Sequence, residues 1–174
     1  MINRFEKSLK GGHPNSLGNT LEVVDEVLKD RGKLQWLYDC YQSDDAVVRL
    51  RVSNGMKRVC KVKPDWVADF LDGLLNDISK IEQASTKWTL STLFLLLDTK
   101  MRNTQRKKAI AVMKSNLHYD DWIVQNTTSE TLAHFAETDT KLRHWLLPEL
   151  KKLTRSRHKS MTRRAQKLLN KFES

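Results

Sequence analysis

The carboxy-terminal part of the chain is rich in cationic side chains that could contact phosphates. Residues 101–174 contain 16 Lys and Arg but only 7 Asp and Glu, so they hold nine of the ten net positive charges. Lys and Arg gain affinity for a polyanion by releasing its condensed counterions. We therefore predict nucleic acid, or a nucleic-acid-associated protein, as the partner. The alternative is that these side chains only keep the surface solvated.

The candidate phosphate contacts fall into two groups along the sequence. The first group surrounds an expected connection between helices and consists of Arg102, Arg106, Lys107 and Lys108. The second group lies near the carboxy terminus and consists of Arg155, Arg157, Lys159, Arg163, Arg164 and Lys167. Whether the two groups form one patch depends on the fold.

Three other side chains are candidates for a concave binding surface. Trp88 and Trp122 could stack on a base or on a partner side chain if they protrude, and burial is the alternative. Arg49 could face a ligand or bond a neighbouring Asp in another repeat. The apolar stripes are expected to bury the remaining large indoles, Trp36, Trp66 and Trp145.

No compact catalytic motif is present in the sequence. It lacks GxSxG, GxGxxG, HExxH and a phosphate-binding loop ending in GK[ST]. The pairs Asp44–Asp45 and Asp120–Asp121 each precede an expected helix, where a carboxylate satisfies free amide groups and favours the helix dipole. The five His and two Cys lack metal-ligand spacing. We expect no metal, no cofactor and more readily a binding protein than an enzyme.

Composition favours one all-helical domain. A chain of 174 residues suits a single domain, and six Gly with three Pro are too few for the frequent turns of a β-sandwich or barrel. No apolar run approaches the length of about 20 residues that crosses a bilayer, so no membrane partner is expected. The two cysteines form no disulfide framework, which is typical of a cytoplasmic protein.

The expected elements begin after a flexible lead-in. Gly, Ser, Asn and Pro dominate residues 8–19, so residues 1–18 are predicted to lie outside a single solenoid domain at 19–174. Connections of a few residues favour antiparallel neighbours. Apolar spacing and capping residues predict about nine helices, near 19–31, 33–42, 44–62, 64–78, 85–98, 104–117, 121–136, 140–153 and 160–172.

An internal repeat of about 38 residues organises these helices. The apolar trio Val52, Met56 and Val59 recurs three times. A period near 40 with two helices per unit is typical of a helical solenoid, because one helix pair cannot bury its apolar face alone. The later copies are Leu90, Phe94 and Leu97, then Thr128, Leu132 and Phe135, then Ala165, Leu169 and Phe172.

The segment that begins at Asp44 resembles the HEAT-repeat family. Asp44, Val48 and Arg49 match the Asp and the Val-Arg pair that these repeats often contain, whereas Thr86 and Lys87 replace the pair in the next copy. The resemblance covers about residues 43–172. It implies a right-handed α-α superhelix of about four helical hairpins that binds a macromolecule on its concave side.

Two other functions are left open. The chain is similar to HEAT-like DNA glycosylases that remove alkylated bases, as both are basic helical solenoids, and that likeness implies a concave cluster of Trp, Asp and Arg. The candidates for it are Trp88, Trp122, Asp98 or Asp121, and Arg163. An adaptor that joins proteins is equally natural for a solenoid.

Overall fold

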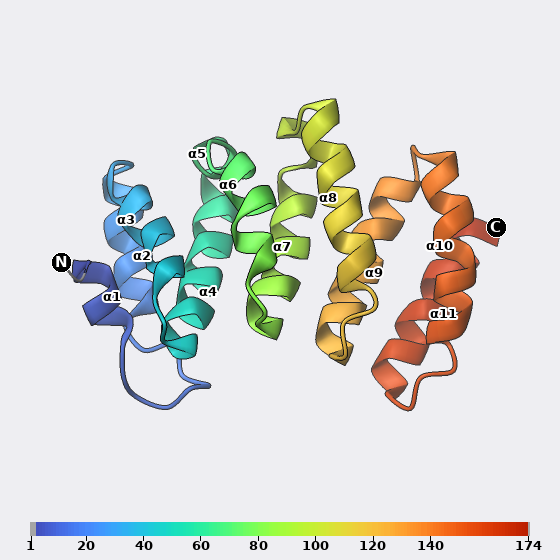
Figure 1. Ribbon diagram of the computed structural model, residues 1–174, viewed down its shortest axis with the longest axis horizontal. Coiled ribbons are helices and arrows are strands. Elements are labelled where there is room, and N and C mark those ends of the chain that lie inside the picture. Colours follow the sequence, from blue (N-terminus) through green and yellow to red (C-terminus); the bar gives the residue numbers. More distant parts are fainter. Residues whose placement is uncertain (1–2, 174) are drawn as a thin grey trace.

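The computed structural model describes residues 3–173, and all of their regular elements are helices (Figure 1). This confirms the predicted all-α class. The α-helices are α1 (Arg4–Leu9), α2 (Thr20–Lys29), α3 (Lys33–Asp39), α4 (Ala46–Val62), α5 (Pro64–Ala68), α6 (Leu71–Asn76), α7 (Ala84–Leu96), α8 (Asn103–Asn116), α9 (Trp122–Ala136), α10 (Thr140–Leu153) and α11 (Lys159–Glu173). Short 3-10 turns, η1 (Cys40–Gln42), η2 (Ile78–Lys80) and η3 (Asp98–Lys100), follow three of them.

Carboxylates define where two of the longest helices begin. Asp45 accepts a hydrogen bond from the amide of Val47 at 2.8 Å, and Asp121 accepts from the amides of Ile123 and Val124, both at 2.9 Å. These bonds satisfy amide groups that have no partner within the helix. The interpretation of the aspartate pairs as helix caps is confirmed at these two positions.

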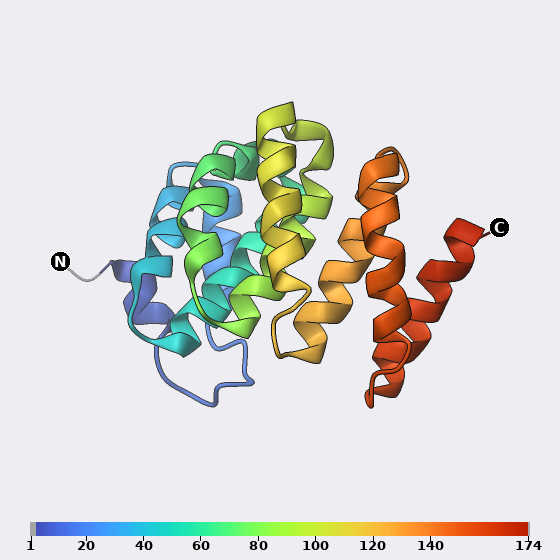
Figure 2. The same cartoon turned by 45° about the vertical axis from the view of Figure 1, so that its right-hand side comes forward.

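The helices form two layers. The apolar side chains of the repeated trio are buried within one of these layers. Helices α2, α4, α7, α9 and α11 pack side by side in that order, while α3, α6, α8 and α10 cover one side of them (Figures 1 and 2). Met56 of α4, Phe94 of α7 and Leu132 of α9 are fully buried, and Leu169 of α11 is almost fully buried. The repeat of about 38 residues in the sequence therefore corresponds to one step from a first-layer helix to the next.

This arrangement leaves one side of the first layer open to solvent. We call the side of α4, α7, α9 and α11 that is turned away from the second layer the free face. Because α4, α7, α9 and α11 all run in one direction and α8 and α10 run in the other, their ends gather at two edges. The loop before α9 and the loop at Arg157 share one edge, the lower one in Figure 1, whereas α8 and α10 begin at the upper edge.

The amino-terminal segment belongs to the fold, so the prediction of a lead-in outside the domain was wrong. Phe5 and Leu9 of α1 are buried in the core. The loop that follows is wrapped around the side chain of Arg51, which is only 1% exposed. Its guanidinium donates to four backbone carbonyls, those of Leu9 (2.6 Å), Gly11 (2.6 Å), His13 (3.2 Å) and Ser16 (3.1 Å).

The glycines that suggested a flexible linker make this wrapping possible. Gly11, Gly12 and Gly18 all have positive φ angles, which L side chains rarely adopt. A Cβ atom on Gly18 would lie 2.8 Å from Cζ of Arg51. The same composition that is typical of a mobile linker is therefore required by a loop that closes on a buried cation.

The structure has eleven α-helices within residues 3–173 instead of about nine. One addition is α1. The other arises because the helix expected at 64–78 is interrupted at Phe70, so that α5 packs on α4 while α6 packs on α8. Trp36 was also expected in the core, but it is 44% exposed and contacts Phe5 edge-on at 5.9 Å. Among the described residues, every helix is too short or too polar to span a bilayer.

Replacing Arg51 by Lys should loosen the amino-terminal loop. A lysine keeps the charge but cannot donate to four carbonyls in fork geometry, so we expect a loss of about 2–3 kcal/mol in the free energy of unfolding. Urea unfolding measures the loss, and hydrogen exchange should show it first in residues 9–18. Arg58→Lys is the control, as Arg58 is an exposed arginine of the same helix. Equal losses in the two variants would contradict the assigned role of Arg51.

Candidate nucleic-acid interface

The first predicted cationic group mainly joins neighbouring helices. Three of its four side chains are held by acceptors from other elements, and only Lys107 is exposed without a bond to another described side chain. Arg106 also lies over the ring of Phe135 at 4.5 Å. The bonds are Arg102 to Asp72 (3.1 Å), Arg106 to Asp98 (2.9 Å) and Lys108 to Asn76 (2.8 Å).

Two carboxylates that pair with cations near the start of α8 have lowered pKa values. The hydrogen bond from Gln105, with the charge of Arg102, lowers the pKa of Asp72. Likewise, the hydrogen bond from Lys100 at 2.6 Å lowers the pKa of Asp65. Phosphates at this upper edge would compete with carboxylates that are already in place, so the group is a poor phosphate site.

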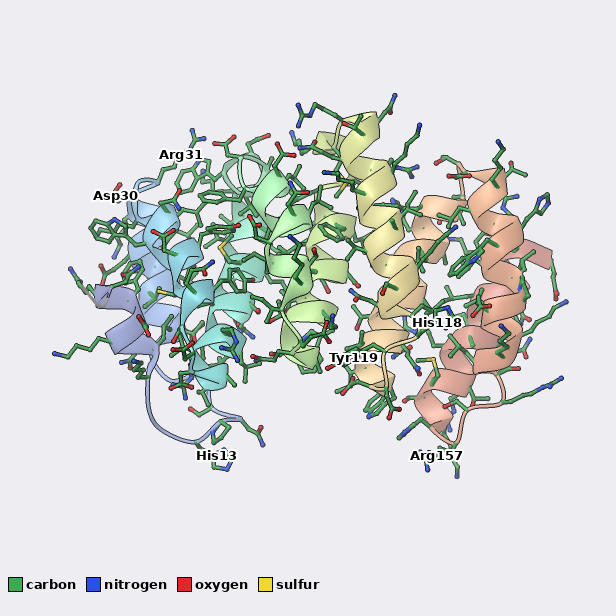
Figure 3. The ribbon with its side chains drawn as sticks, in the orientation of Figure 1. His13, Asp30, Arg31, His118, Tyr119 and Arg157 are labelled. Atoms are coloured by element: carbon green, nitrogen blue, oxygen red, sulfur yellow. The ribbon has the colours of Figure 1, made fainter. Side chains whose placement is uncertain are left out.

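The second predicted group is more available. Arg155, Arg157 and Lys159 are exposed around the loop between α10 and α11, and none has an acidic partner in the part of the chain that the structure describes. Figure 3 shows Arg157 extending from the lower edge. The loop part of the second group, with Arg155, Arg157 and Lys159, therefore lies at the edge opposite to the first group.

Helix α11 extends this second group along its length. Lys159, Arg163, Lys167 and Lys171 are spaced four residues apart, so they share one exposed face of the helix. Like charges at this spacing destabilise a helix by about 0.2–0.5 kcal/mol per pair. The opposite face of α11 holds the helix to α9 and α10 through Met161, Ala165, Leu168 and Leu169.

A groove of about 430 Å³ separates α9 from α11 on the free face. Two ion pairs cross it, Arg164 to Glu130 and Lys171 to Glu137. The hydrogen bond from Lys171 lowers the pKa of Glu137. Lys167 lines the groove between these pairs and has no carboxylate partner within residues 3–173. Of the second predicted group, Arg164 is thus the one side chain with an acidic partner among the described residues.

One cationic cluster was missed by the sequence analysis. Lys57, Arg58 and Lys61 lie on one side of α4, and no carboxylate of the described chain pairs with them, although Arg58 donates to Asn54 at 2.6 Å. Burial lowers the pKa of Lys57, and the charges of Lys61 and Arg58 lower it further. Residues 1–100 are nearly neutral in total, which hid this cluster. The spacing of the three residues along one helix was the available signal.

The three candidates for a concave surface have different environments. Trp88 is half-buried in α7. Arg49 joins two repeats, but its side-chain partner is Gln83 at 2.8 Å and not an Asp, and it also donates to the carbonyl of Ser43. Trp122 is 38% exposed at the lower edge, where its ring stacks on His158.

The residues of the glycosylase alternative are not gathered in one cluster. Asp98 follows α7 at the upper edge, where it binds Arg106 and lies 3.2 Å from His134. Trp122 and Asp121 are at the lower edge, and Asp121 caps α9. Across residues 3–173, no three His, Cys, Asp or Glu side chains are placed to hold a metal ion.

Comparisons with known proteins give a fold and no family. No family model and no curated protein matches the chain. Among solved structures, the chain is similar to the crystal structure of an engineered protein, with 16% identity and a TM-score of 0.63, over 97% of this chain and 79% of that one. At this identity the likeness supports the helical fold alone.

The ion pairs between repeats should make stability depend on pH in acid. The carboxyls of Asp65, Asp72 and Glu137 have lowered pKa values, so their contribution is present above their ordinary values of 3.8 and 4.5 and is lost as the pH falls below them. We expect the urea midpoint to drop between about pH 5 and pH 3. Asp72→Asn should lower it at pH 7 and make the drop shallower. The control is Asp120→Asn, and an Asp72→Asn profile parallel to wild type would contradict the role of the pair.

Proposed function

We propose that this protein is a non-enzymatic α-solenoid binding module that contacts the phosphates of a nucleic acid through α11 and the loop before it. One observation supports this most strongly: Arg155, Arg157, Lys159, Arg163 and Lys167 are exposed together and have no acidic partner among the described residues. The 38-residue packing period also supports a right-handed, HEAT-like superhelix as its architecture.

Electrostatics explains why phosphates suit this surface. The repulsion between Lys159, Arg163 and Lys167 along one helix face weakens α11, and an anion bound between them relieves it. By contrast, several cations of the other predicted group are placed beside carboxylates, as in the pairs of Arg102 and Arg106. The phosphate backbone of a nucleic acid gains more binding energy at α11, because no carboxylate has to be displaced from Lys159, Arg163 or Lys167.

The other functions have less support. Glycosylase chemistry needs its aromatic, acidic and cationic groups around one base, whereas Asp98 and Trp122 lie at opposite edges. A protein adaptor could use the groove between α9 and α11, but the two ion pairs that cross it would have to be displaced or rearranged first. Two free, buried cysteines, whose pKa values burial raises to about 12, are compatible with the cytoplasm as the proposed location.

Fluorescence anisotropy with labelled oligonucleotides at two salt concentrations tests this proposal. We expect micromolar or tighter binding at low salt that weakens steeply as salt rises. The triple variant Lys159→Ala, Arg163→Ala and Lys167→Ala should lose about tenfold or more in affinity, and the slope of log affinity against log salt should fall by about two to three.

A control variant that removes the same amount of charge elsewhere distinguishes binding at a specific site from a general effect of net charge. Lys7, Lys80 and Lys141 are exposed and lie outside α4 and α11, so changing all three to Ala removes the same charge elsewhere. This control should bind nearly as wild type, and circular dichroism should show unchanged helix content in both variants. No binding by wild type at low salt, or equal losses in the two triple variants, would overturn the proposal.

A further inference from the structure

The lower edge combines an exposed aromatic pair with the cations of the proposed interface. Trp122 begins α9 and His158 immediately precedes α11, so the two rings come from successive hairpins. Their centroids are 5.6 Å apart and their planes differ by 20°, which is a stacked arrangement. Large apolar side chains are usually buried, and an indole that is 38% exposed offers a surface on which another flat ring can stack.

A polar hollow of about 350 Å³ adjoins this pair of rings. Its lining retains hydrogen-bonding capacity that the fold does not use. Gln125 donates through Nε2 to the carbonyl of Tyr119 at 3.1 Å, which leaves its Oε1 able to accept. The hydroxyl of Ser156 accepts from the amide of His158 at 3.1 Å and can still donate. The remaining lining residues are Asp120, Asp121, Trp122, Arg157 and His158.

The charges around the hollow discriminate between the parts of a nucleotide. Inside it, the two carboxylates of Asp120 and Asp121 outnumber the single guanidinium of Arg157, so a phosphate is disfavoured there, while their oxygens can accept hydrogen bonds from the amino groups of a neutral base. Outside it, Arg155 and Lys159 are exposed on the adjoining loop and helix start, where a phosphate would meet cations. A nucleotide is thus favoured with its base in the hollow and its phosphate on α11.

We infer that this hollow binds an unstacked base and that the nucleic acid of the proposed function is single-stranded. The inference rests on the proposed function. In a duplex both faces of each base are covered by neighbours, so a base must leave the stack before it can lie on Trp122, whereas a single strand offers its bases freely. A base in the hollow extends the stack of Trp122 and His158 by a third ring.

Removing the indole tests the inference. Trp122→Ala should weaken binding of a ten-nucleotide single strand about 5- to 100-fold, while binding of the matching duplex should stay within about twofold of wild type. Trp122→Phe retains a ring and should recover most of the loss. Trp36→Ala is the matched control, because Trp36 is as exposed but lies at the other end of the molecule.

A single strand of the same length with abasic sites isolates the base contact. It keeps every phosphate, so wild type should bind it more weakly than the normal strand by about the factor lost in Trp122→Ala. Trp122→Ala should bind the two strands alike. The intrinsic fluorescence of wild type should also be quenched by the normal strand more than that of Trp122→Phe.

The possible outcomes distinguish a failure of the base-binding inference from a failure of the proposed phosphate binding. Suppose that wild type binds the single strand and the duplex, and that Trp122→Ala leaves both affinities unchanged or lowers them equally. The base site is then wrong, and phosphate binding by α11 stands. If wild type binds no oligonucleotide at low salt, both proposals fail. A loss confined to the single strand that contains bases supports both.

Discussion

The structure depends on the burial of one apolar seam that no helix pair can bury alone. Val52, Leu90 and Leu132 belong to the continuous core and, like Ala165 of α11, are inaccessible to solvent. Each helix of the first layer therefore needs the next one, since an isolated hairpin would expose this row to water. Within residues 3–173, the helices at the two ends of the stack have a first-layer neighbour on one side only.

The two ends meet this constraint in different ways. At the amino-terminal end, α1 places Phe5 and Leu9 over the core, and the loop after it is held by Arg51. A buried cation without a carboxylate is stabilised here by carbonyl dipoles alone, which only a closely wrapped backbone can supply. At the carboxy-terminal end, α11 has no repeat beyond it within the described chain. Its outer face is cationic, so it is compatible with water and with a charged partner.

The periodic part of the fold could be predicted from the sequence. Non-periodic contacts between residues far apart in the sequence could not. Burial of Met56, Phe94 and Leu132 follows from spacing within the sequence, because each contact repeats the one before. The cage around Arg51 joins residues about 40 positions apart, and its glycines have the composition of a linker. Phe70 interrupts a helix whose apolar stripe continues through it, so the stripe gave no sign of the break.

Local compensation of charge, more than its total, decides where a polyanion can bind. Arg102 and Lys159 count equally in the net charge of +10, yet Arg102 faces Asp72 from an earlier hairpin and Lys159 faces solvent. Acids that precede a cation by about 30 residues lie one helix pair away in a solenoid with this period, and they can pair with it. In α11, Arg164 and Lys171 pair in this way with Glu130 and Glu137 of α9, whereas Lys159, Arg163 and Lys167 have no carboxylate partner among the described residues. A helix whose exposed cations lack such partners is therefore a natural place for a phosphate-binding surface, as α11 is.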